Sequence, residues 1–232
     1  MTNVFKTLSL FFVTVIVAAC NNADKTRERN TQAKLFCDYK ITGEEGHELV
    51  NCLFLFKQGG PEGRPVLLKD RANITLDGEI IYPDSAGLSG VIYDTTKPLS
   101  EFASKHNIVY TDVEGKAHSE SFEFTPFSLA EEIPAKIEKA SFTIRLNGLG
   151  EGKVPVRLVL ADTAFATNDI NEIVNVDNGN LLITDSMLQK LKAGPIFFEI
   201  VKEEEKNLRK ESNTNGRIIT SYGLKREFEL TE

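Results

Sequence analysis

The sequence predicts an all-β protein made of two tandem antiparallel β-sandwiches. Three observations support this fold class. From residue 35 onward, apolar residues mostly recur with a period of two, which is the spacing of half-buried strands. Turn pairs such as Asp-Gly and Asn-Gly separate these short segments. One segment, residues 185–193, has the spacing of a clear helix.

The composition indicates a folded domain and argues against one class of partner. The chain has 232 residues, of which 41% are hydrophobic and 26% are charged, so it can build a core. Its formal net charge of −7 argues against nucleic acid as a partner, because phosphate binding needs a basic surface. The absence of Trp also argues against a large aromatic ligand groove.

Residues 1–19 have the proportions of a signal peptide that is removed. Lys6 supplies the positive charge, and the apolar run 8–19 is shorter than the ~20 residues of a membrane span. The run ends in Val17-Ala18-Ala19-Cys20. This ending resembles the lipobox of bacterial lipoproteins, whose cysteine is lipidated and becomes the first residue of the mature chain. An ordinary signal peptide, with Cys20 incidental, is the alternative.

The lipoprotein resemblance implies an anchor in the bilayer. Cys20 would carry a diacylglycerol and a further acyl chain such as palmitate, and two or more chains anchor stably. Asn21 stands where members retained in the inner membrane typically carry Asp, so the resemblance favours the outer membrane, on either face. Residues 20–33 contain no large apolar residue and are expected to form a lipidated flexible tether.

The first sandwich is expected over residues 34–129. Its predicted strands are 35–41, 49–56, 72–76, 79–82, 88–93, 107–110 and 118–124, with a short helical turn within 98–106. Pairing the first two strands across the loop 42–47 places Cys37 opposite Cys52. In an exported chain whose Cys20 is lipidated, this even pair predicts a disulfide. Two buried free thiols are the alternative.

The second sandwich is expected over residues 134–232, after an acidic, Pro-containing boundary. Its predicted strands are 141–146, 154–160, 173–176, 181–183, 195–201 and 218–230, and the charged segment 203–215 is expected to be an exposed connection. Asp185 is expected to cap the helix and Gly194 to end it. This architecture broadly resembles immunoglobulin domains, without their Cys-Trp-Cys hallmark. One larger sandwich is the alternative.

No motif predicts catalysis or a cofactor. His47, His106 and His118 lack metal-ligand spacing, and the sequence around Ser89 does not complete the glycine pattern of a nucleophile elbow. The region from Asp162 to Glu172 is rich in oxygen ligands that suit calcium, but it has no calcium-loop spacing. A weak calcium site there therefore stays open beside ordinary turns and caps. We expect a protein that is not an enzyme.

Asp followed by Ser or Thr and a small or apolar residue recurs in the chain. This pattern resembles the O-glycosylation sequon of exported proteins in Bacteroidota, and Ser85 and Thr163 are the best candidates. Ordinary turn and cap pairs are the alternative.

These features favour an envelope lipoprotein with a non-enzymatic binding or assembly role, acting on an envelope protein or a glycan. The alternative is a carbohydrate-binding surface lipoprotein. Because sugar faces stack on aromatic rings, an exposed coplanar pair among the five Tyr residues would favour that alternative, and burial of all five would argue against it.

Overall fold

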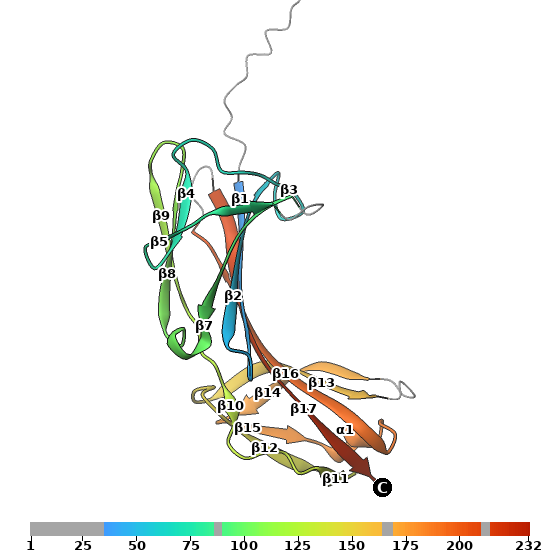
Figure 1. The fold of residues 1–232 in the computed structure, drawn as a ribbon. Helices are drawn as coiled ribbons and strands as arrows, with labels where there is room; N and C mark the ends of the chain where they lie inside the picture. Colours follow the sequence, from blue (N-terminus) through green and yellow to red (C-terminus); the bar gives the residue numbers. More distant parts are fainter. Residues whose placement is uncertain (1–34, 86–89, 164–168, 210–213) are drawn as a thin grey trace, which may run out of the picture. The chain divides into compact units, whose positions relative to one another are not determined.

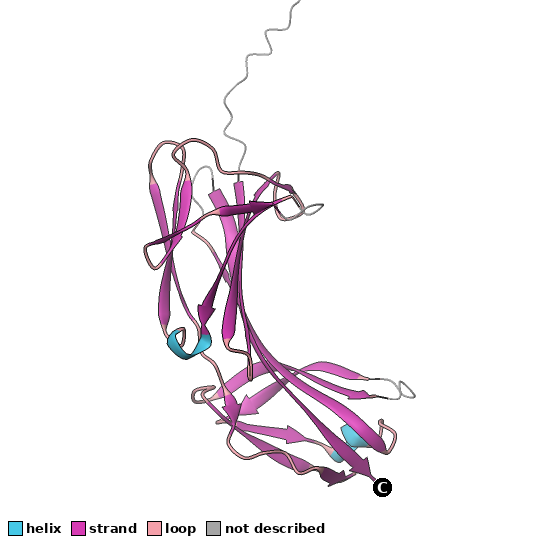
Figure 2. Ribbon diagram, in the orientation of Figure 1, coloured by secondary structure: helices cyan, strands magenta, loops and turns pink. Residues whose placement is uncertain are grey.

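A computed structural model describes residues 35–85, 90–163, 169–209 and 214–232 of the chain. The described elements are strands with two short helical segments, which confirms the all-β fold class (Figures 1 and 2). The strands are β1 (Leu35–Glu44), β2 (Leu49–Gln58), β3 (Arg64–Pro65), β4 (Asn73–Leu76), β5 (Glu79–Ile81), β6 (Pro83–Ser85), β7 (Val91–Pro98), β8 (Lys105–Thr111), β9 (Ala117–Glu123), β10 (Ser128–Leu129), β11 (Lys136–Glu138), β12 (Phe142–Asn147), β13 (Lys153–Asp162), β14 (Ile170–Asp177), β15 (Asn180–Ile183), β16 (Gly194–Asn207) and β17 (Thr214–Thr231).

The strands form two sheets. The 13-stranded sheet has the order β10-β12-β15-β14-β13-β16-β17-β1-β2-β7-β6, with β11 beside β17 and β3 beside β2. The 4-stranded sheet has the order β5-β4-β8-β9. Most neighbours are antiparallel, but β1 and β17 are parallel, with Asp38 beside Arg217. The first and last described strands are therefore direct neighbours.

The hairpin of β16 and β17 is longer than the sequence indicates. The segment 203–215 was expected to be a loop, and this expectation is wrong because β16 continues to Asn207 and β17 begins at Thr214. Residues 202–206 are all charged, so no apolar alternation marks them as a strand in the sequence, but their backbone is paired with β17. The hairpin was also assigned to residues 134–232 alone. Instead, the first part of β17 pairs with β1 and its end pairs with β11.

The division into domains 34–129 and 134–232 stays a prediction. The strand pairing shows that β17 is hydrogen-bonded to strands on both sides of that predicted boundary. The prediction placed each strand in the sandwich formed by its neighbours in the sequence. It missed that a strand of 18 residues, such as β17, is long enough to pair with strands of both predicted sandwiches.

The two helical segments lie close to their predicted positions. A 3-10 turn, Leu99–Glu101, falls within the predicted 98–106. The helix α1, Asp185–Leu188, is shorter than the predicted 185–193, and its cap is Thr184 and not Asp185. Thr184 has an extended backbone, and its Oγ1 accepts a hydrogen bond from the backbone N–H of Met187 at 3.3 Å, which is the geometry of an N-cap.

The core near β1 lies between the two sheets. Alternate residues of β1 and β2 point toward the 4-stranded sheet, and Tyr39, Phe54 and Phe56 are at most 2% exposed. Across the interface, the ring centroid of Phe56 lies 5.0 Å from that of Tyr110 on β8. Because successive strand residues face opposite sides, the intervening residues of β1 and β2 face away from this core.

Candidate functional site

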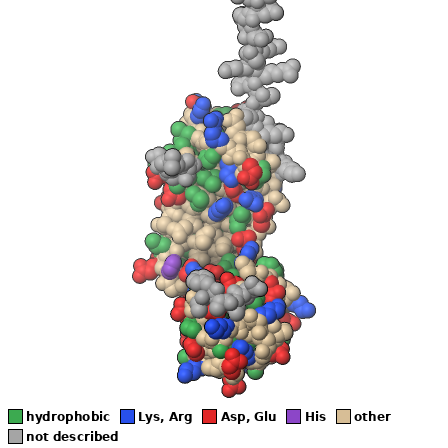
Figure 3. Space-filling view, turned by 90° about the vertical axis from the view of Figure 1, so that its right-hand side faces the viewer, with side chains coloured by type: hydrophobic (Ala, Val, Ile, Leu, Met, Phe, Trp, Pro, Cys, Tyr) green, Lys and Arg blue, Asp and Glu red, His purple; other side chains and the backbone are tan. Residues whose placement is uncertain are grey.

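Five neighbouring strands, β7, β2, β1, β17 and β16, present a second face that points away from the 4-stranded sheet. We call it the open face, and Figure 3 looks toward this side of the molecule. It is defined by the outward residues of these strands, which are Asn51, Leu53, Leu55, Asp94, Thr96, Ile92, Lys40, Thr42, Ile219, Ser221, Glu203 and Glu205. Those on β1 are exposed, whereas Leu53 and Ile219 are half-buried.

The strand registers arrange these residues in rows across the sheet. One row runs Asp94, Leu53, Lys40, Ile219 and Glu205, so two half-buried apolar side chains alternate with charges of both signs. The adjacent row runs Thr96, Asn51, Thr42, Ser221 and Glu203 and is mostly hydroxyl and amide. The open face therefore offers a partner two apolar side chains around a central lysine, with hydroxyl, amide and carboxylate groups beside them.

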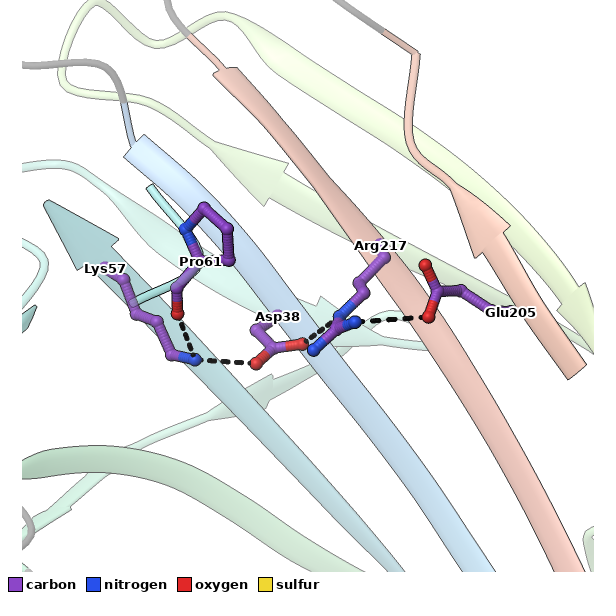
Figure 4. Close-up of polar contacts among 5 residues, drawn as sticks. All are labelled: Asp38, Lys57, Pro61, Glu205 and Arg217. Carbon is purple, nitrogen blue, oxygen red and sulfur yellow. Dashed lines mark hydrogen bonds and ion pairs between the residues drawn. The ribbon is translucent and has the colours of Figure 1, made fainter. Parts of the chain in front are cut away.

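A buried carboxylate lies on the same side of β1. Asp38 is 1% exposed, and its two oxygens accept hydrogen bonds from Lys57 Nζ at 2.7 Å and from Arg217 Nε at 2.9 Å (Figure 4). Lys57 also donates to the carbonyl oxygen of Pro61 at 2.9 Å. Arg217 donates from a terminal nitrogen to Glu205 at 3.1 Å. This Asp38 network joins four adjacent strands, β2, β1, β17 and β16.

The positively charged side chains of Lys57 and Arg217 keep Asp38 ionised. Burial would raise the pKa of this carboxyl, but hydrogen bonds from Lys57 and Arg217 outweigh it and hold the pKa below its usual value. Asp38 is therefore charged at neutral pH. A buried ion pair contributes little net stability compared with apolar packing, but loss of one partner is costly. The network consequently favours the one register in which Asp38 meets Arg217.

The predicted disulfide between Cys37 and Cys52 is wrong. Cys37 pairs with Phe56, and Cys52 pairs with Ile41, so the hairpin register differs by four residues from the prediction. Four strand residues span about 13 Å, and a disulfide needs Cα atoms within about 7 Å. The register differs because Gly43 and Glu44 pair with β17, which leaves a longer connection to β2. Both cysteines are free and buried, as the alternative proposed.

The tyrosines do not form an exposed stacking platform among the described residues. Tyr39, Tyr93, Tyr110 and Tyr222 are at most 5% exposed, and Tyr82 is 74% exposed. The criterion set for carbohydrate binding, an exposed coplanar pair, is therefore not met in the part of the chain that the structure describes.

The histidines make structural contacts. The ring of His106 lies 2.7 Å from Asp77 Oδ2 and 3.0 Å from the carbonyl oxygen of Phe102. The Nε2 atom of His118 lies 2.9 Å from Asp112 Oδ2. Within the described ranges, no three His, Cys, Asp or Glu side chains lie close enough to hold a metal ion. Asn168, in the segment considered for calcium, lies outside those ranges.

Only some of the predicted lipidation and glycosylation sites lie within the described residues. Cys20 and the tether lie outside the described residues, as does the side chain of Ser85. Thr163 is exposed, and its hydroxyl donates to the carbonyl oxygen of Pro195 at 3.2 Å. No helix in the described ranges is long and apolar enough to cross a membrane. Lipidation and glycosylation remain predictions.

Sequence reasoning missed the Asp38 network. In a half-buried strand, polar positions alternate with apolar ones and are expected to face water, so Asp38 looked ordinary. The only local signal is an acidic residue between two residues that face the core, Cys37 and Tyr39. Its partner Arg217 lies 179 residues away, and local patterns do not encode that pairing.

No known protein family and no curated protein matches the sequence. Among solved structures, the chain is similar to the Yersinia pseudotuberculosis adhesin InvE, with 11% identity over 83% of this chain and a TM-score of 0.25. It spans 61% of that adhesin chain. It is also similar to the structure titled DIP-gamma IG1+IG2, with 9% identity over 81% of this chain and 94% of that one, and a TM-score of 0.22. Neither likeness bears on what this chain binds.

Proposed function

We propose that this chain is a lipid-anchored protein of the bacterial cell envelope, attached to the outer membrane through Cys20, with a non-enzymatic binding role. In this proposal its partner is an envelope protein that docks on the open face. The lipobox supports the anchor, and the arrangement of the open face supports the binding role.

The observation that carries the binding role is the row through Lys40. Half-buried Leu53 and Ile219 flank the exposed ammonium group of Lys40, and acidic residues stand at both ends of the row. A partner that covers this row would remove apolar surface from water and meet charges at defined positions. The backbone of these strands is already hydrogen-bonded in the sheet, so docking would cost little backbone ordering.

The open face suits a protein better than a glycan. Sugar recognition relies on aromatic stacking, and none of the open-face residues is aromatic. The hydroxyl and amide row could instead make cross-partner hydrogen bonds of the kind found at protein interfaces. Tyr82, the one tyrosine with a largely exposed side chain among the described residues, lies outside the set that defines the open face.

The anchor is tested separately by changing Cys20 to Ala. Metabolic labelling with a fatty acid should mark the wild-type chain and leave Cys20→Ala unlabelled, because the thiol that would carry the diacylglycerol is gone. Membrane fractionation should find the wild-type chain in the outer membrane. Equal labelling of both proteins would contradict lipidation at Cys20.

The docking role is tested by reversing one charge on the open face. A tagged chain carrying Lys40→Glu is compared with wild type and with Lys153→Glu, which makes the same change at an exposed position of β13. After mild detergent extraction, a partner recovered with wild type and Lys153→Glu should be depleted at least tenfold with Lys40→Glu. Identical recovery with all three chains would contradict docking at this face.

A further inference from the structure

A cavity of about 210 Å³ opens between the two sheets, on the opposite side of β1 from the open face. Residues of β1, β8 and β9 line it, among them Cys37, Tyr39, Ile108, Tyr110, His118 and Glu120. By comparison, an apolar cavity of about 150 Å³ can bind benzene. The cavity is therefore large enough for one ring that carries a small substituent.

Tyr110 is the unusual residue of this cavity. The residue as a whole is 4% exposed, and its hydroxyl opens toward the cavity without a hydrogen-bond partner among the described residues. Two comparably buried tyrosines are different. The hydroxyl of Tyr93 accepts a hydrogen bond from the backbone N–H of Leu68 at 2.9 Å, and that of Tyr39 bonds to the Cys37 thiol. A hydroxyl that opens into a cavity without a protein partner is free to donate a hydrogen bond to a bound group.

Tyr110 can act as a donor toward the cavity. Burial raises the pKa of its phenol, so the hydroxyl stays protonated at any physiological pH. Its ring is held from one side by His118, with ring centroids 5.6 Å apart and planes inclined by 20°. The position of the phenol is therefore fixed before any ligand arrives, which lowers the entropy cost of binding.

Two of the side chains that line the cavity, Glu120 and His118, already have protein partners. Glu120 accepts hydrogen bonds from Lys206 Nζ at 3.2 Å and from the backbone N–H of Arg209 at 2.9 Å. His118 is held by Asp112. The floor includes Ile108, which is 1% exposed. A ligand would therefore meet an apolar floor, the Tyr110 hydroxyl and the exposed side chain of Arg209, which also lines the cavity.

We propose that this cavity binds a small ring compound that accepts a hydrogen bond from the Tyr110 hydroxyl. The ligand's ring would pack against Ile108 and the tyrosine rings, and a carbonyl-type oxygen would face Tyr110. This site is independent of the open face, so its failure would leave the proposed docking role untouched.

Benzamide, a neutral ring with one carbonyl acceptor, is a direct probe. Titrated into the full mature chain, it should bind saturably and shift the NMR signals of Ile108. Tyr110→Phe should weaken the binding about tenfold, as expected for one hydrogen bond. This variant loses only a hydroxyl without a described partner, so its thermal midpoint should not fall. Tyr82→Phe, which alters an exposed tyrosine, is the matched control and should leave affinity unchanged.

A second pair of variants tests the location without touching Tyr110. Ala117 lines the cavity, and Ala117→Phe should block binding, whereas Ala103→Phe at an exposed position elsewhere should not. Equal affinity of wild type and Tyr110→Phe would overturn the proposal. So would the absence of saturable binding to the wild type, which would mean that water alone occupies the cavity.

Discussion

The Nε atom of Arg217 lies 2.9 Å from Oδ1 of Asp38, although 179 positions separate the two residues in the sequence. This pair joins the first described strand to the last, in the only long parallel ladder of the described sheet core. The backbone pairing alone would tolerate a slip, but a slip would leave the buried Asp38 without its cation. The open face depends on this register, because the register aligns Lys40 with Ile219.

Replacing Asp38 with Asn should destabilise the fold by about 3 kcal/mol. The change keeps the shape but removes the charge, and it leaves Lys57 and Arg217 without their buried partner. Urea unfolding checks this value. Asp94→Asn, at an exposed position on the same face, is the control and should change stability by less than about 0.5 kcal/mol. Similar small effects in both variants would show that the network is not needed for the fold.

Acid should unfold the protein partly through two carboxyls. Hydrogen bonds from Lys57 and Arg217 overcome burial to lower the pKa of Asp38, and a hydrogen bond from Arg226 lowers the pKa of Glu132. Their ordinary values are 3.8 and 4.5. A lowered pKa in the folded state contributes stability above the ordinary value, and this contribution is lost as pH falls through the folded value.

The urea midpoint should therefore fall below about pH 4.5. The fall should be shallower in Asp38→Asn, because that variant has already lost the larger buried contribution. A parallel fall in both proteins would assign the acid sensitivity to other carboxyls.

The two core thiols should be inert in the folded protein. Burial raises the pKa of Cys37 to about 11 and that of Cys52 to about 12, so neither is a thiolate at pH 8. In a chain carrying Cys20→Ala, a thiol reagent should label no cysteine under native conditions and two after denaturation without reductant. A count of zero after denaturation would show that the cysteines form a disulfide.

Gly216 should not tolerate a side chain. A Cβ built on this residue would overlap the backbone of Cys37 on the neighbouring strand, and its φ of +155° disfavours other residues. Gly216→Ala should therefore cost more than about 2 kcal/mol, by the sum of strain and steric overlap. Gly78 also has a positive φ, but a Cβ there would meet open space. Gly78→Ala should cost about 1 kcal/mol. Equal costs at the two positions would show that β1 and β17 are not closely packed.

Local strand structure was predictable from the sequence, and long-range pairing was not. Period-two patterning located β12 and β13, and Asp77-Gly78 marked the turn between β4 and β5. The charged end of β16 was missed because its side chains face solvent on both sides, so no apolar period marks it. A strand of this kind is held by backbone pairing with β17, which composition does not reveal.

The candidate site was harder to predict from the sequence than the individual strands. The register of the hairpin between β1 and β2 was predicted from the length of its loop alone. The prediction missed the pairing of Gly43 and Glu44 with β17. The same missing ladder concealed the partner of Asp38 and the rows of the open face. The type of side chain at each position can be read from the sequence, but its neighbours on adjacent strands cannot.

The docking role of the open face is tested most directly by photo-crosslinking in intact cells. A photoreactive amino acid at Lys40, in the centre of the face, is compared with one at Glu172, an exposed position of β14 outside it. After irradiation, docking at the open face predicts a discrete adduct of higher mass from position 40 and none of that mass from position 172. The absence of an adduct at position 40, or the same adduct from both positions, would contradict it.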